Sequence, residues 1–288
     1  MTNIIFQWGG AEVALGMDES GDGCSVVLLP ALSSISTRNE MLPLFDRLSS
    51  EFHVATVDWP GFGDLPRPRA DWSPEILSRF LDWFLDELIA TPCRIVAAGH
   101  AAAYALHAAA RRPGLIERLA LIAPTWRGPL PTMMGGQRPW FSRVRAAIDN
   151  PVVGPLLYRL NVSRPVLDSM ARRHVYSRAG WLAGERLAAK LEVTGAPGAR
   201  HGSVRFVSGA LDRIESRDSF LDLARGAHAP ILVVYGAETP PRSRAEIEAL
   251  AALPNVRLER LPIGKLAIHE ELPDEVAAAI APFLRGND

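Results

Sequence analysis

Short apolar runs alternate with amphipathic stretches along most of the chain, and this alternation constrains the possible fold more than any other feature of the sequence. The runs are rich in β-branched residues, are bounded by turn residues and have the length of single strands. Eight such runs are present: Ile4–Trp8, Val13–Met17, Ser25–Leu29, His53–Asp58, Arg94–Ala98, Arg118–Ile122, Pro230–Tyr235 and Val256–Leu261. The stretches with helical spacing of apolar residues are Asn39–Ser49, Ser73–Ile89, Ala102–Arg112, Arg242–Ala252 and Pro273–Leu284. We therefore expect an α/β fold with an eight-stranded, mostly parallel sheet and helices on both of its faces.

The alternation is modified in two places, by a tight turn between the first two runs and by a long stretch without a predicted strand. Gly9-Gly10-Ala11 joins the first two runs as a hairpin, so we expect one edge of the sheet to be antiparallel. From residue 124 to about residue 227 the sequence shows helical patterns separated by Pro and Gly, and no convincing strand. These patterns are Trp140–Ile148, Val166–Tyr176, Trp181–Leu191 and Ser219–Ala224. We predict a core domain of residues 1–123 and 228–288, with a helical lid inserted over residues 124–227.

The composition is that of a globular protein with little net charge. Hydrophobic residues make up 48% of the 288 residues and charged residues 22%, which excludes a disordered or coiled-coil chain. A net charge of -1 provides no basic field for phosphate backbones, so we expect no nucleic-acid partner. The longest weakly polar run, Ile95–Ala110, contains two histidines and falls short of the ~18 apolar residues of a membrane span.

Cysteine and histidine usage argues against disulfides, metal sites and secretion. Cys24 and Cys93 are too few for a disulfide framework or a four-thiolate metal site, and the first residues do not form a secretory signal, so we predict a cytoplasmic protein. The seven histidines are scattered, with no His-x-x-x-His on a helix. Gly61-Phe62-Gly63 lacks the third glycine of a dinucleotide fingerprint. We therefore expect neither a metal ion nor a cofactor.

Several short segments follow one another in an order that resembles the α/β-hydrolase superfamily. They are Leu28–Ala31, Asp58–Gly63, Val96–Ala103, Arg111–Ile122, Ile231–Gly236 and His269–Val276. The segment Asp58–Gly63 reads Asp-Trp-Pro-Gly-Phe-Gly after a predicted strand, and Val96–Ala103 joins a strand to a helix. The resemblance extends along nearly the whole chain outside the predicted lid, and it implies the fold of that superfamily.

The same resemblance locates the three catalytic positions of the superfamily. Its nucleophile is a serine on a sharp strand-to-helix turn, Gly-x-Ser-x-Gly, which a histidine and an acid assist. The matching positions in this chain are Ala101 for the serine, Thr239 for the acid and Leu266 for the histidine, or Lys265 if that loop is shifted by one residue. A methyl group cannot attack a carbonyl, threonine lacks the carboxylate charge, and neither leucine nor lysine has an imidazole.

The turn and the oxyanion loop depart from the superfamily pattern in different ways. Gly99 and Ala103 keep the small flanks of the turn, so we expect Ala101 to adopt the strained backbone conformation of the lost nucleophile. Pro30-Ala31 replaces the His-Gly of the oxyanion loop. The backbone N–H groups of Leu32 and Ala102 are the remaining candidates for an oxyanion hole.

Three residues are candidates for substitute chemistry. His100 stands before the nucleophile position, where relatives commonly use histidine in packing. His269 matches a second histidine that relatives often carry near the last helix. Arg38 has the guanidinium needed to clamp a carboxylate or phosphate, although a surface ion pair with Glu40 or Asp46 is an equal alternative. The predicted ligand-binding residues are Leu32, Ser33, Arg38, His100, Ala101, Ala102, Tyr104, Trp126 and Trp140.

Two classes of function follow from the altered triad. The first is a non-catalytic pseudoenzyme that binds a small apolar molecule under the lid, or an unknown protein partner. The second is an enzyme with other chemistry, such as a lyase, an isomerase or an atypical hydrolase, acting on a small apolar substrate. Ordinary serine-hydrolase activity is not expected, and a fold alone does not decide between the two classes. For the first class we expect a ligand pocket between Ala101 and the lid.

Overall fold

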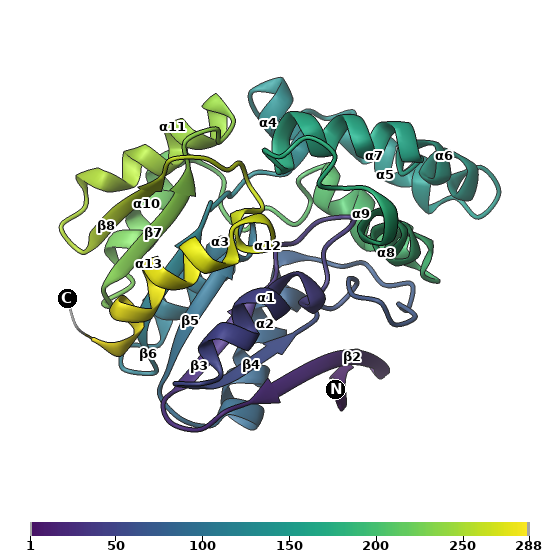
Figure 1. Ribbon diagram of the computed structural model, residues 1–288. Helices are drawn as coiled ribbons and strands as arrows, with labels where there is room; N and C mark the ends of the chain where they lie inside the picture. Colours follow the sequence, from purple (N-terminus) through teal and green to yellow (C-terminus); the bar gives the residue numbers. More distant parts are fainter. Residues whose placement is uncertain (1, 287–288) are drawn as a thin grey trace.

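The computed structural model describes residues 2–286 and contains one eight-stranded sheet (Figure 1). Its strands are β1 (Thr2–Trp8), β2 (Ala11–Ser20), β3 (Ser25–Leu29), β4 (His53–Val57), β5 (Cys93–Ala98), β6 (Ile116–Ile122), β7 (Ile231–Gly236) and β8 (Val256–Leu261). The spatial order is β1-β2-β4-β3-β5-β6-β7-β8. The β1–β2 and β2–β4 pairs are antiparallel, and the remaining pairs are parallel. The eight predicted strands and the antiparallel edge are thus confirmed.

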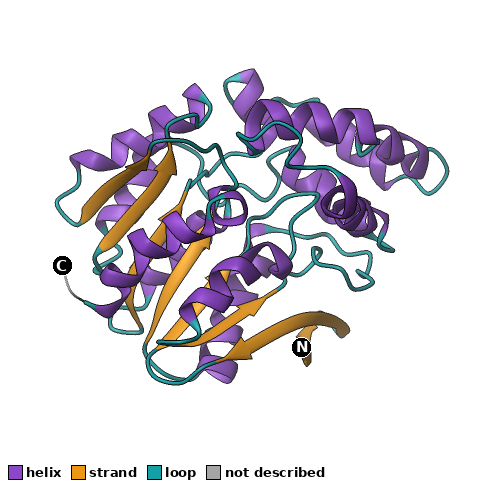
Figure 2. Ribbon diagram, viewed as in Figure 1, coloured by secondary structure: helices purple, strands orange, loops and turns teal. Residues whose placement is uncertain are grey.

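Helices cover both faces of this sheet (Figure 2). They include η1 (Arg38–Met41), α1 (Leu42–Leu48), α2 (Pro74–Trp83), η2 (Phe84–Ile89), α3 (Ala101–Arg111), α10 (Arg217–Arg225), α11 (Pro241–Ala249), η4 (Leu250–Ala252), α12 (Ile268–Glu271) and α13 (Pro273–Arg285). Successive strand side chains point to opposite faces, so Val27 and Leu29 join a core with α2, α3 and α10, whereas Val26 and Leu28 join a core with α1 and α13. The alternation of strands and helices in the sequence therefore produces two apolar layers.

A helical insertion, residues 124–216, separates β6 from β7. It contains α4 (Pro129–Met134), α5 (Phe141–Asp149), α6 (Gly154–Asn161), α7 (Arg164–Met170), η3 (Ala171–Val175), α8 (Gly184–Gly195) and α9 (Ala199–Val207). Figure 1 shows these helices at the upper right, beyond the carboxyl ends of the central strands. The next helix, α10, packs on α3, and its Phe220 and Ala224 belong to the main core, so we describe α10 with the core.

None of the helices in residues 2–286 has both the length and the apolar character that crossing a membrane requires.

Candidate functional site

The turn from β5 into α3 lies at the carboxyl edge of the sheet, and its left-handed residue is Gly99. Gly99 has a φ of +51°, His100 lies in the right-handed helical region, and α3 begins at Ala101. The prediction that Ala101 carries the strained conformation is therefore wrong. A left-handed backbone costs least at a residue without a Cβ, so the chain turns at the glycine, two residues before Ala101. Ala101 itself places a fully buried methyl group in the first turn of α3.

Two backbone amides near this turn already donate hydrogen bonds within the protein. The Ala31 N–H donates to Glu40 Oε1 at 2.6 Å, and the Ala102 N–H donates to the Gly99 carbonyl at 3.3 Å. Leu32, the other predicted oxyanion residue, is buried. A donor that is engaged by a protein oxygen does not stabilise a developing oxyanion unless that bond breaks.

His100 and Tyr104 fill the space beside the turn and converge on one carbonyl. The Tyr104 hydroxyl donates to the Leu211 carbonyl at 2.7 Å, and His100 Nε2 lies 3.2 Å from the same oxygen. Both side chains are buried, and Tyr104 also packs on Trp59. The hydroxyl of Tyr104, a predicted ligand-binding residue, is thus engaged within the protein. The segment after α9 is thereby held against α3.

His100 also faces Asp212, a residue that the sequence analysis did not single out. His100 Nε2 lies 3.5 Å from Asp212 Oδ1. Burial lowers the pKa of His100 to about 4. Burial also raises the pKa of Asp212 to about 7, although the Gly128 N–H donates to its carboxylate. Desolvation disfavours the charged form of both groups, so at pH values between these pKa values the two side chains form a neutral pair.

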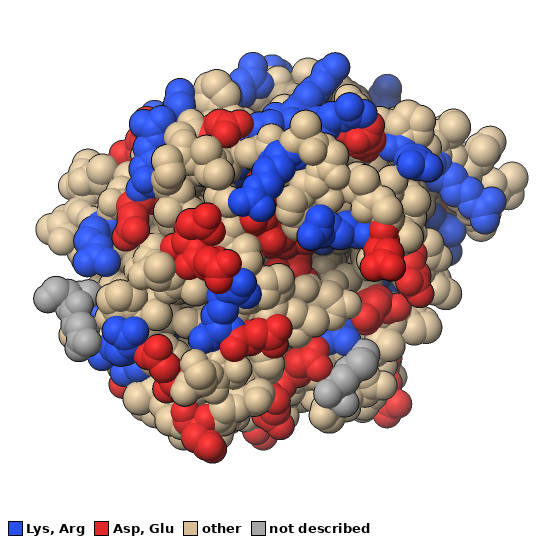
Figure 3. Space-filling view, viewed as in Figure 1, with Lys and Arg blue, Asp and Glu red and all other residues tan. Residues whose placement is uncertain are grey.

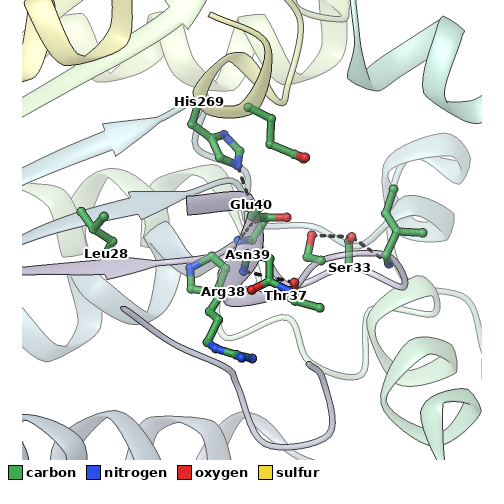
Figure 4. A network of polar contacts seen from close by, with 12 residues as sticks. Leu28, Ser33, Thr37, Arg38, Asn39, Glu40 and His269 are labelled. Carbon is green, nitrogen blue, oxygen red and sulfur yellow. Dashed lines mark hydrogen bonds and ion pairs between the residues drawn. The ribbon is translucent and has the colours of Figure 1, made fainter. Parts of the chain in front are cut away.

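Arg38 is buried among three carboxylates and does not face the turn. Its guanidinium contacts Asp58 at 2.5 Å, Asp18 at 2.9 Å and Asp64 at 2.9 Å. Gly16 lies against it, since a Cβ at Gly16 would overlap the guanidinium. In Figure 4 the Arg38 side chain extends away from His269 and Glu40. The expected pairing with Glu40 or Asp46 is therefore replaced by these three aspartates, which contact Nε and Nη1 of a guanidinium that is buried from solvent.

Glu40 points to the opposite side of η1 and joins a buried charge network. The Thr37 side chain caps η1 by accepting from the Asn39 N–H, which fixes the helix that carries Glu40. His269 Nε2 lies 3.4 Å from Glu40 Oε1, and Lys190 Nζ lies 3.9 Å from Glu40 Oε2 (Figure 4 shows the His269–Glu40 approach). Burial alone raises the pKa of Glu40, but the His269 hydrogen bond and the nearby positive charges lower it below its usual range.

Lys190 connects this network to α12. Its Nζ lies 3.0 Å from Glu270 Oε2, and the Tyr176 hydroxyl donates to Glu270 Oε1 at 2.9 Å. Burial opposes the charge of Lys190, but Glu270 and Glu40 raise its pKa above the usual value. The network therefore joins η1, the inserted helix α8 and α12 through charges removed from water.

A groove of about 380 Å³ opens beside the network, between η1 and α8. Its walls are lined by Thr37, Asn39, Glu40, Pro43, Asp64, Trp181, Arg186, Ala189, Lys190, Glu192, Val193 and Glu270. Four of these residues are acidic and two are basic, so acidic residues outnumber basic ones in the lining. The groove lies to the side of the turn at Gly99, and neither Ala101 nor Tyr104 lines it.

A second, smaller cavity of about 210 Å³ contains one predicted ligand residue. Trp126 lines it together with arginines of α10 and α11, Arg217 and Arg242. Arg217 is held by Glu246 in two hydrogen bonds of 2.9 Å, and Arg242 donates to backbone carbonyls of α4. These guanidinium groups are engaged within the protein.

The remaining predicted residues lie apart from one another. Thr239 is buried in the turn after β7, and Leu266 is half-buried in the loop before α12. The Ser33 hydroxyl pairs with Ser36 at 2.7 Å within its own loop. Trp140, at the start of α5, is 43% exposed and points to solvent. The structure thus groups His100 with Tyr104 but does not assemble the nine predicted ligand residues into one pocket.

Sequence reasoning missed the charge network beside His269, which consists of Glu40, Lys190 and Glu270. Glu40, Lys190 and Glu270 lie far apart in the sequence, and only Lys190 carries a recognisable signal, since it is one of two lysines among 31 basic residues. One ligand atom each of Glu40, His269 and Glu270 lie within 4.8 Å of one another. We assign no metal to this cluster, because the Lys190 ammonium already supplies the positive charge that both carboxylates face.

Comparisons with known proteins agree with this architecture. The structure resembles a thermophilic esterase from Thermogutta terrifontis, with a TM-score of 0.75, 18% identity and 99% of each chain covered. It also resembles the haloalkane dehalogenase DatA from Agrobacterium tumefaciens C58 (TM-score 0.73, 18% identity, 99% of this chain and 96% of that chain). A bromoperoxidase from Bacillus anthracis is similar too (TM-score 0.72, 16% identity, 99% and 100% covered).

The search of curated proteins found no match. Residues 26–279, however, match the family described as the alpha/beta hydrolase family. That match spans strands β3 to β8, the turn at Gly99, the helical insertion and the segment that carries His269. The chain belongs to the α/β-hydrolase family.

Proposed function

We propose that this chain is a small-molecule-binding protein built on the α/β-hydrolase scaffold and that it lacks serine-hydrolase chemistry. The observation that carries the proposal is the turn after β5: its residues are Gly99, His100 and Ala101, and none supplies a hydroxyl or thiol nucleophile. The family's acid and histidine positions, which the sequence resemblance locates at Thr239 and Leu266, supply no carboxylate and no imidazole.

The groove between η1 and α8 is the proposed binding site. Asp64 is paired with Arg38, and Glu40 and Glu270 share Lys190. Among the described residues Glu192 is the lining acid without an ion pair, which favours a ligand with an amine or another cationic group. This ligand class differs from the apolar molecule that the sequence suggests, because the aromatic residues expected to line an apolar pocket are largely buried elsewhere or exposed. As part of this proposal, α8 acts as a lid: it forms one wall of the groove, so a displacement of α8 changes access to the groove.

Thermal-shift measurements test this proposal directly. A ligand that binds the folded state at a hundredfold excess over its dissociation constant stabilises it by about 2.7 kcal/mol, or roughly 5 °C for a chain of this size. We expect a panel of diamines, betaines and basic amino acids to contain stabilising members, and fatty acids to have little effect.

A matched pair of variants on α8 locates the binding site. Glu192 lines the groove, whereas Glu185 is exposed on the same helix outside it. Glu192→Gln is expected to reduce the shift produced by a cationic ligand, and Glu185→Gln is expected to leave it unchanged. A flat response to all cationic ligands, or equal losses in both variants, contradicts the proposal.

The His269–Glu40 pair supports a second candidate, an enzyme with other chemistry. A carboxylate that orients a histidine is the usual arrangement of a general base, and His269 Nε2 lies 3.4 Å from Glu40 Oε1. Turnover of a groove-binding ligand that is lost in Glu40→Gln and His269→Gln, while both variants keep binding, establishes this candidate. Binding without turnover excludes it for that ligand.

A further inference from the structure

Exposed apolar side chains are concentrated on the helical insertion. Thirteen large apolar side chains among the described residues are exposed, and ten of them lie between Met133 and Met170. The most exposed belong to α6 and the turn before it: Val152 is 82% exposed, Leu156 63% and Leu160 60%. Monomeric proteins rarely leave such side chains clustered in water without a function.

The exposed residues of α6 form a single stripe. Val152, Val153, Leu156, Leu157 and Leu160 are spaced so that all five lie on one side of a helix. The buried side of α6 carries Tyr158, which packs with residues of α5 and α9. We call the five exposed residues the α6 stripe. The stripe thus points away from the protein's own core.

The same region is strongly basic, unlike the rest of the chain. Residues 127–178 contain nine arginines, no lysine and only two acidic residues, Asp149 and Asp168. This segment has a net charge of +7, which leaves -8 for the remainder of the chain. Figure 3 shows Lys and Arg side chains among uncharged ones at the upper right of this face, where α4 to α7 lie.

Arginines close to the α6 stripe in sequence are available to a partner. Arg143, Arg159 and Arg164 are exposed and, within residues 2–286, form no ion pair. Asp149 is engaged by His201 and Arg205, and Asp168 by Arg172. The positive charge around the stripe is therefore not neutralised locally.

We propose that the α6 stripe and its arginines dock this protein on the surface of an anionic lipid bilayer. Leucines and valines on one helical face enter the boundary between headgroups and acyl chains, while arginines beside them contact anionic headgroups. A second copy of this chain is disfavoured as the occupant, because two faces of the same strong positive charge repel each other. The helix lies on the membrane rather than across it, since no described helix is suited to span one.

Vesicle co-sedimentation tests this inference. The full chain is expected to sediment with vesicles of phosphatidylcholine mixed with phosphatidylglycerol and to bind phosphatidylcholine alone only weakly. High salt should release it, because exposed charges are screened beyond ~10 Å at 0.1 M salt.

Paired variants separate the two contributions. Leu156→Ser with Leu160→Ser is expected to weaken the partition coefficient at least about tenfold, and Leu88→Ser with Ile263→Ser, exposed elsewhere, is the control. Arg159→Gln with Arg164→Gln is expected to weaken it on the order of twentyfold, about fivefold for each charge. Arg69→Gln with Arg260→Gln is the matched control outside the insertion.

Three results overturn the inference. The first is equal sedimentation with neutral and anionic vesicles. The second is an equal loss of binding in the control variants. The third is self-association in sedimentation equilibrium that the two leucine substitutions abolish, without any vesicle binding, which assigns the stripe to a contact between copies.

Discussion

Arg38 and Glu40 are two positions apart on η1 and enter separate charge networks. The Arg38 guanidinium forms ion pairs with three aspartates, whereas Glu40 faces Lys190 and His269 beside the groove. The sequence makes Arg38 a candidate for binding a carboxylate or phosphate group of a substrate. Its ion pairs with the three aspartates instead give Arg38 a structural role, which a measurement of the free energy of unfolding tests.

Replacing Arg38 with methionine tests the structural role. The substitution leaves Asp58 buried without its cation, so Arg38→Met should lower the free energy of unfolding by about 3–5 kcal/mol. Arg47→Met removes a solvent-exposed pair with Asp274 and should cost less than about 1 kcal/mol. Urea denaturation of both variants measures the difference. A small effect of Arg38→Met would return Arg38 to the list of ligand-binding candidates.

The neutral pair of His100 and Asp212 predicts opposite pH responses in two variants. The folded-state pKa of His100 is depressed from 6.5 to about 4, so its contribution to stability is present above pH 6.5 and is lost as the pH falls toward 4. The folded-state pKa of Asp212 is raised from 3.8 to about 7, so its contribution is present below pH 3.8 and is lost as the pH rises toward 7.

Asp212→Asn leaves only the contribution of His100 to the pH dependence of stability, and His100→Gln leaves only the contribution of Asp212. Relative to the unmodified chain, Asp212→Asn should lose stability as the pH falls from 6.5 to 4, and His100→Gln should gain stability over the same range. Each change should approach about 3 kcal/mol. Denaturation midpoints across this range measure both trends, and parallel trends in the two variants contradict the neutral pair.

Among the elements, η1, α8 and α12 are joined by a network of charged side chains. Lys190 on α8 lies between Glu40 of η1 and Glu270 of α12. Lys190→Met leaves both carboxylates without a cation and should lower the free energy of unfolding by about 3 kcal/mol. Adding Glu270→Gln removes one of the uncompensated charges, so the double variant should be more stable than Lys190→Met alone. Additive losses in the double variant would show that Lys190 and Glu270 do not interact.

The sequence predicts the elements well because hydrophobic period and turn residues are local properties. The strand runs such as Ser25–Leu29 coincide with observed strands, and α13 begins at the predicted Pro273. The prediction of a strained backbone at Ala101 was wrong because the motif specifies only which residues are present. A left-handed φ costs least free energy at glycine, so Gly99 adopts it.

The candidate site was less predictable because its partners come from distant segments. Glu40 and Lys190 are 150 positions apart, and nothing local in either segment specifies that α8 packs beside η1. The same holds for His100, in the turn between β5 and α3, and Asp212, near the end of the helical insertion. Motif comparison identifies the positions at which a family carries catalytic residues. Contacts that are specific to a divergent chain depend on its tertiary packing, which the motifs do not specify.

At the scale of the whole molecule, the core and the helical insertion differ in net charge and in the functions proposed for them. The core carries the sheet and the turn at Gly99, the helical insertion carries the basic, partly apolar outer surface, and the buried network joins the two through Lys190. A groove between η1 and α8 lies where the two regions meet. The proposed ligand binding and the proposed membrane docking therefore involve different helices of the insertion, α8 and α6.

Intact-mass spectrometry after incubation with a fluorophosphonate probe decides whether the scaffold retains serine-hydrolase chemistry. Such a probe forms a covalent bond with an activated serine, and the turn of this chain offers only Gly99, His100 and Ala101. We predict an unchanged mass at probe concentrations that fully label an active esterase of the family. A stoichiometric adduct that disappears when a single serine, such as Ser33, is replaced by alanine would show that another residue serves as nucleophile, and it would contradict the proposed non-hydrolytic function.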